Sequence, residues 1–228
     1  MSRFSWFKQG ILFLSLLLSG CVSSFHNSEN EAKILIKESS KVFDRFDNHK
    51  TLKEYRKYLN SAYAVIIFPK VIKASFMYGG EGGNGLLLKR FNAKGWSHPT
   101  FVTLAAASIG FQVGVQETAV ILIIKTEPAF RAVLDYQGKL GADAGATMGV
   151  WGVGMESSTT TNFEADILAF ANSNIGAYLG ISLEGAVIAR RRDLNEGFYG
   201  KGATPKNIFS GYYQKPEIDQ LREAIGDR

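Results

Sequence analysis

The chain contains a single cysteine, Cys21, so it cannot form an intramolecular disulfide. Histidine is also scarce. His26, His49 and His98 are widely separated, and no two of them form a His-x-x-x-His pair. A zinc site therefore has little support, and His98, next to Pro99, is interpreted as a turn residue. A fold without a disulfide must be stabilised by packing of its apolar side chains.

The N-terminal apolar run, residues 11–18, is too short to cross about 30 Å of hydrocarbon. It follows Arg3 and Lys8 and precedes small residues, which is the arrangement of a secretory signal peptide. Leu18-Ser19-Gly20-Cys21 also resembles the bacterial lipoprotein box, in which cysteine becomes the first residue of the mature chain. The resemblance implies a diacylglyceryl thioether on Cys21 and a further acyl chain, such as palmitate, on its amine.

Acylation predicts where the mature protein resides. Two or more acyl chains hold a protein firmly on a bilayer, since each buried CH₂ contributes roughly 0.8 kcal/mol. By analogy with bacterial sorting, Val22, which is not Asp, favours the outer membrane, with the protein facing the periplasm. The alternative is an ordinary signal peptide with an incidental cysteine at its cleavage site.

Charge and length limit the class of protein. Loss of Arg3 and Lys8 with the signal lowers the formal net charge from +5 to +3. That charge is compatible with anionic lipid head groups but too weak to indicate nucleic acid. About 200 residues remain, enough for one domain with its own core. We expect a signal peptide over 1–20, a tether over 21–27 and a single domain over 28–228.

Helical periodicity characterises the start of this domain, residues 28–60. The Ser28-x-x-Glu31 spacing of a capping box and the apolar residues that follow predict an amphipathic helix near residues 29–47. A second helix is expected to run to Asn60. The apolar stripe of the first helix either packs on the domain or lies on the bilayer.

The period changes to that of β-strands over residues 62–213. We expect a strand over 64–68 that ends at Pro69, and a hairpin whose arms, 74–78 and 86–89, are joined by Gly79 to Gly85. This glycine-rich stretch lacks the Lys-Ser/Thr of a phosphate-binding loop. Further strands are expected over 109–116, 119–124, 166–171 and 177–189, and short helices after Thr126, Asp193, Thr204 and Lys215, the last over 216–225.

These patterns predict an α+β fold in one β-rich domain. The expected architecture is a curved, mainly antiparallel sheet or a barrel-like sandwich, with N-terminal and peripheral helices.

The sequence offers no catalytic constellation. Glu164 and Asp166 share one side of an extended segment, but charges at strand edges commonly serve to discourage edge pairing. Ser182 lies in a motif one residue too long for a nucleophile elbow and is interpreted as structural. We therefore expect a protein that is not an enzyme and needs no cofactor.

Basic residues at the ends of the expected strands are the candidate binding groups. If these ends converge, their side chains would form a patch for phosphate head groups, with Arg offering two parallel hydrogen bonds. The candidates are Lys70, Lys73, Lys89, Arg90, Arg190, Arg191 and Arg192.

Several motifs occur in the order in which the SYLF domain has them: Tyr78-Gly79-Gly80-Glu81-Gly82, Gly95-Trp96-Ser97-His98-Pro99 and Leu140-Gly141-Ala142-Asp143-Ala144. The chain resembles this family from Tyr63 to Tyr213. The resemblance implies a lipid-binding domain, since eukaryotic members bind acidic phospholipids, phosphoinositides among them. The yeast member also binds actin, which a periplasmic protein does not meet in its own cell.

The resemblance therefore implies binding of anionic phospholipid by a membrane-anchored protein. The resemblance does not identify any individual lipid-binding residue in this chain. The alternative is an envelope protein that recognises a protein or a cell-wall component.

Overall fold

The computed structural model describes residues 25–91, 95–135, 147–152, 165–173 and 186–226. The predicted signal peptide, Cys21 and most of the predicted tether lie outside these residues. No helix in the described ranges is long and apolar enough to span a bilayer.

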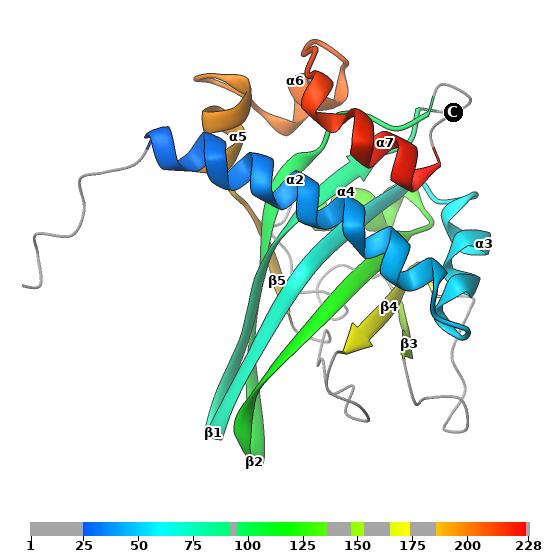
Figure 1. Cartoon of the computed structure of the whole chain (residues 1–228), viewed down its shortest axis with the longest axis vertical. Helices are drawn as coiled ribbons and strands as arrows, with labels where there is room; N and C mark the ends of the chain where they lie inside the picture. Colours follow the sequence, from blue (N-terminus) through cyan, green and yellow to red (C-terminus); the bar gives the residue numbers. More distant parts are fainter. Residues whose placement is uncertain (1–24, 92–94, 136–146, 153–164, 174–185, 227–228) are drawn as a thin grey trace, which may run out of the picture.

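The first described element is the long helix α2 (Phe25–Asp47), which crosses one end of the sheet (Figure 1). Val42, Phe43 and Phe46 on its apolar stripe are fully buried. The stripe therefore packs on the domain, which answers the question that the sequence left open. The helix starts earlier than expected, at Phe25, so Ser28 lies in its first turn and does not cap it.

The other helices confirm the remaining helical predictions. The second predicted helix is a 3₁₀ turn, η1 (Leu52–Glu54), followed by α3 (Tyr55–Leu59). Thr204 caps its helix as expected, because its side-chain oxygen accepts a hydrogen bond from the backbone N–H of Asn207. The remaining elements are α4 (Glu127–Asp135), α5 (Arg192–Tyr199), α6 (Pro205–Phe209), η3 (Pro216–Ile218) and α7 (Asp219–Ile225).

Two long antiparallel strands, β1 (Ala64–Lys89) and β2 (Thr100–Ile124), form the framework of the sheet. The second half of β2 pairs with β4 (Ile167–Ser173), which pairs in parallel with β3 (Met148–Gly152). The first half of β2 pairs with β5 (Val187–Arg190). The described strands make an open, mainly antiparallel sheet, so the α+β prediction is confirmed and its curved-sheet alternative describes the architecture.

The predicted hairpin loop at Gly79 to Gly85 is wrong. These residues belong to β1 and pair with β2, from Gly79 opposite Ser108 to Gly85 opposite Val102. Pro69 also does not end the strand, because a register shift between Phe68 and Val71 accommodates it. The strands expected at 109–116 and 119–124 are likewise parts of β2. The backbone groups of Gly79 to Gly85 form hydrogen bonds with β2, a partner distant in the sequence that local turn signals do not identify.

The paired strands β1 and β2 bend together, so that each runs away from the helices and then returns (Figure 1). A register shift between Ser75 and Met77 separates the two halves of β1. The halves come so close that a Cβ on Gly85 would lie 2.5 Å from the carbonyl oxygen of Ile67. Glycine is therefore required on the returning half because backbone occupies the space of a side chain.

The core lies where this bent pair of strands meets the helices. Every residue of Ala119–Ile124 is buried, as expected for a strand covered on both faces. Phe170 on β4 places its ring 6.3 Å from that of Tyr55 and 6.0 Å from that of Tyr58. These contacts pack α3 against the sheet.

Gly85→Ala should destabilise the protein by about 1–3 kcal/mol, because the added methyl group meets the backbone of Ile67 and the ring of Phe68. Gly80→Ala is the matched control, since its nearest neighbour would be 3.8 Å away. We expect the control to change stability by no more than about 0.5 kcal/mol. Chemical denaturation measures both, and equal stability of the two variants would contradict the close approach.

Candidate functional site

A groove of about 390 Å³ lies where β5 leads into α5. Arg190, Arg192 and Glu196 line it, together with Asn195 and the residues from Gly202 to Pro205. The pairing of Arg190 with Val102 fixes the end of β5 against β2. The groove is thus held by the sheet on one side and by the start of a helix on the other.

Asn195 holds this junction together. Its buried side-chain oxygen accepts hydrogen bonds from the Thr100 hydroxyl, at 2.9 Å, and from the backbone N–H of Phe101, at 3.0 Å. Its amide nitrogen donates to the carbonyl oxygens of Phe101 and Arg191, at 3.2 and 2.8 Å. A buried amide with its hydrogen-bonding groups engaged rigidifies the wall of the groove. Asn195 is not among the residues that the sequence singles out, because a lone Asn in a short helix carries no distinctive signal.

The two arginines of the groove differ in their partners. Arg192 is 82% exposed and donates from Nε to Glu196 at 3.1 Å. The pKa of Glu196 is lowered by this hydrogen bond and by a second one from the backbone N–H of Gly202. Arg190 is exposed and has no ion-pair or hydrogen-bond partner for its side chain in the described part of the chain. Its guanidinium donors are therefore available to a ligand.

Arg191, between them, serves the fold. Its guanidinium forms ion pairs with Asp193 at 2.7 Å and with Glu31 of α2 at 3.4 Å. The hydrogen bond from Arg191 lowers the pKa of Asp193. Arg191 thereby links the β5–α5 junction to α2.

Lys70 and Lys73 lie in the first half of β1, away from this groove. Lys70 pairs with Glu117 of β2 and lines a second groove, between α2 and β1. Lys73 pairs at 2.8 Å with Glu81, whose side chain is 0% exposed. A buried carboxylate without a cation is strongly destabilising, so Lys73 stabilises the fold by pairing with Glu81.

Lys89 and Arg90, at the end of β1, contact aromatic rings. The ammonium of Lys89 lies 5.2 Å from the centroid of the Tyr63 ring. The Arg90 guanidinium lies 4.2 Å from that of Trp96 and donates to the carbonyl oxygens of Leu59 and Ala62, at 2.8 and 3.1 Å. Of the seven basic candidates, Arg190 and Arg192 are the two that share a groove within the described residues, and lipid binding by any of the seven stays a prediction.

The remaining chemical candidates give no catalytic site in the part of the chain that is described. Glu164 and Ser182 lie outside it. Asp166 accepts hydrogen bonds from the backbone N–H and the hydroxyl of Thr147, both at 3.1 Å, and from the hydroxyl of Thr126 at 3.2 Å. The bond from the Thr147 N–H is the main cause of the lowered pKa of Asp166. These bonds join β3, β4 and the start of α4. The described residues contain no cluster of three His, Cys, Asp or Glu side chains suited to a metal.

Comparison with known proteins shows the family. The model of the Ysc84 family, described as Las17-binding protein actin regulator, matches residues 105–228. Protein YSC84 of Saccharomyces cerevisiae is 33% identical over 162 residues, which are 69% of this chain and 34% of the yeast protein. The chain belongs to the Ysc84 family. The resemblance to the SYLF domain is thereby confirmed.

Two further relatives support the Ysc84 assignment. The LAS seventeen-binding protein 3 of Saccharomyces cerevisiae is 30% identical over 162 residues, 69% of this chain and 35% of that protein. The SH3 domain-containing YSC84-like protein 1 of Xenopus laevis is 27% identical over 206 residues, 89% of this chain and 60% of that protein. The chain thus spans about a third of the yeast relatives.

The matched range of the Ysc84 model includes Arg190 and Arg192 and excludes the basic residues of β1. The groove at the start of α5 therefore belongs to the part of the chain that the family model describes.

Replacing Lys73 tests whether its ion pair with Glu81 stabilises the fold. Lys73→Met should lower the free energy of unfolding by about 3–5 kcal/mol, because Glu81 would remain buried without a partner. Lys70→Met removes an exposed ion pair and should cost no more than about 1 kcal/mol. Urea denaturation distinguishes the two, and equal losses would contradict a buried Lys73–Glu81 pair.

His98 should make the stability of this Ysc84-family domain depend on pH. The residue is 4% exposed, and burial, aided by Arg222, lowers its pKa to about 4 from an ordinary 6.5. The unfolded state therefore binds more protons between these values, so stability is complete above pH 6.5 and falls as pH decreases towards 4.

The loss from this one group can reach about 3 kcal/mol, at about 1.4 kcal/mol per pH unit. His98→Gln should flatten the dependence of unfolding free energy on pH within this window. An unchanged slope in the variant would show that His98 does not cause it.

Proposed function

We propose that this Ysc84-family protein is a lipoprotein of the cell envelope that binds anionic phospholipid reversibly, without making or breaking a bond. In this proposal acyl chains on Cys21 anchor it in the outer membrane, facing the periplasm. The observation that carries the proposal is the groove in which Arg190, without a partner among the described residues, lies beside the exposed Arg192.

The chemistry of the groove suits a phosphate group. A guanidinium presents its N–H donors in a planar fork that matches phosphate oxygens. The volume of about 390 Å³ is within the range of small-ligand sites. Glu196 keeps Arg192 oriented towards the groove, and a phosphate could share that guanidinium because it has donors to spare.

The position of the groove relative to the start of α2 also supports the proposal. α5 lies beside the first turn of α2 (Figure 1), and a Cβ on Gly197 would come within 2.7 Å of the Ser28 side chain. Phe25, the first residue of α2, follows Cys21 by four positions. An anchor at Cys21 would therefore hold the α5 groove close to the bilayer surface.

Vesicle co-sedimentation tests the proposal. The full chain carrying Cys21→Ser, which removes the acylation site, is mixed with vesicles of phosphatidylcholine alone or with added phosphatidylglycerol. The difference in binding between acidic and neutral vesicles is the readout, because it cancels any contribution of the apolar N-terminal run. We expect Arg190→Gln/Arg192→Gln to reduce this difference at least tenfold, since each basic residue near an anionic surface contributes about 1 kcal/mol.

The matched control is Lys53→Gln/Arg131→Gln, which removes the same charge from exposed positions on η1 and α4. If both double variants lose binding equally, net charge and not the groove attracts the lipid. If wild type shows no preference for acidic vesicles, the lipid hypothesis is wrong.

A protein-binding role is the second candidate. It is favoured by the name of one relative, LAS seventeen-binding protein 3, which identifies that protein by the protein it binds. In this chain the partner would be a protein or a cell-wall component of the envelope. Capture of a stoichiometric partner by wild type, together with equal binding to acidic and neutral vesicles, would favour this role.

A further inference from the structure

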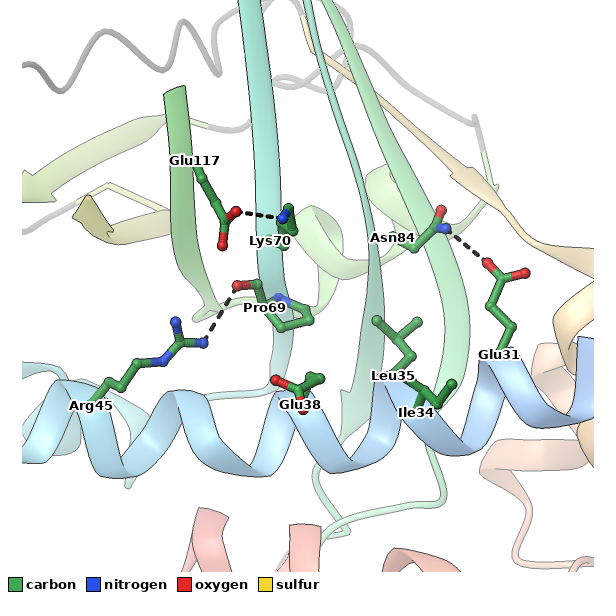
Figure 2. A pocket seen from close by; sticks show the side chains of 9 residues that line it. All are labelled: Glu31, Ile34, Leu35, Glu38, Arg45, Pro69, Lys70, Asn84 and Glu117. Carbon is green, nitrogen blue, oxygen red and sulfur yellow. Dashed lines mark hydrogen bonds and ion pairs between the residues drawn. The ribbon is translucent and has the colours of Figure 1, made fainter. Parts of the chain in front are cut away.

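The groove between α2 and β1 is a second candidate site, separate from Arg190 and Arg192. It has a volume of about 340 Å³, and Figure 2 shows the side chains that line it. Its apolar lining consists of Leu35, Pro69 and Ile34, of which Ile34 is 55% exposed. An isoleucine left open beside other apolar groups in a cavity provides a surface for an apolar ligand.

The acidic residues of this groove are neutralised within the chain. Glu117 pairs with Lys70, and Glu38 pairs with Lys41 at 2.7 Å. Glu31 accepts a hydrogen bond from the amide of Asn84 at 3.1 Å and pairs with Arg191. The lining therefore holds no acid without a partner that would attract a cation.

Arg45 is the exception among the charged residues of the groove. Its guanidinium makes one long hydrogen bond, from Nη2 to the carbonyl oxygen of Pro69 at 3.5 Å (Figure 2). Its Nε is buried and has no hydrogen-bond partner among the residues that the structure describes. A guanidinium has five N–H donors, so most of those of Arg45 are unused. A carboxylate in the groove could accept hydrogen bonds from the Nη1 and Nη2 donors of Arg45, which hold only the long bond to Pro69 within the described part of the chain.

We propose that this groove binds a long-chain fatty acid, with the carboxylate at Arg45 and the alkyl chain along Pro69, Leu35 and Ile34. The groove places the guanidinium of Arg45, most of whose donors are unused by the described residues, next to an apolar surface, which matches a molecule with one anionic head and one apolar tail. A peptide fits less well, because it would bring an N–H and a C=O at each residue that need partners. The inference does not depend on phospholipid binding at Arg190 and Arg192.

Photolabelling tests the site on the full chain. The probe is a palmitate analogue with a diazirine at the end of its tail, and mass spectrometry locates the adduct. We expect the adduct within residues 31–38 or 69–84, blocked by palmitate. Hexadecanol, which lacks the charge, should need at least tenfold higher concentration to block it, since a hydrogen bond to a charged group typically changes binding about tenfold or more.

Variants complete the test. Arg45→Gln should raise the probe concentration for half-maximal labelling about tenfold, as expected for loss of a charge-assisted contact. Ile34→Ser, at an exposed position that the fold tolerates, should raise it several-fold, and it decides the matter if Arg45→Gln fails to fold. Lys53→Gln, which removes an exposed charge outside both grooves, is the control and should label as wild type.

Labelling spread evenly over the surface would overturn the inference. Equal blocking by palmitate and hexadecanol would also overturn it, as would unchanged labelling of both Arg45→Gln and Ile34→Ser.

Discussion

The structure depends on the close approach of the two halves of β1 after the bend in the paired strands. Backbone of the outgoing half occupies the space where side chains would stand at Gly83 and Gly85 of the returning half. The same approach buries the carboxylate of Glu81, which is acceptable because Lys73 pairs with it at 2.8 Å. Glycines and a buried ion pair are thus two aspects of one constraint, namely that two strands must pack closer than ordinary side chains allow.

Helix α2 packs on this bent framework, lines one of the two grooves and is tied by an ion pair to the junction beside the other. Its buried stripe packs on the core, while Glu31 reaches Asn84 on β1 and Arg191 at the β5–α5 junction. One groove lies between α2 and β1, and the other lies beyond the α5 junction that Arg191 ties to α2. A change in the position of α2 would therefore affect both.

The chain belongs to the Ysc84 family, and both proposed ligands are anions held by arginine side chains. Three of the seven basic candidates serve the fold. Lys73 pairs with the buried Glu81, Arg90 donates to the carbonyl oxygen of Leu59, and Arg191 pairs with Asp193. Both proposals rest on guanidinium groups, those of Arg190 and Arg45, whose donors are largely unused by the described residues. A count of basic residues could not have made this distinction.

The sequence by itself determined the helices, because caps such as Thr204 and apolar periods of 3.6 are local, and it determined that Ala119 to Ile124 is a buried strand. It misjudged Gly79 to Gly85, since glycine serves a turn and a close strand contact equally well and only the partner strand decides between them. The sequence also supplied the list of basic candidates, Lys70 to Arg192. Only the tertiary structure decided which of them share a groove, because that depends on contacts between residues far apart in the chain, such as Glu31 with Arg191 and Phe101 with Asn195.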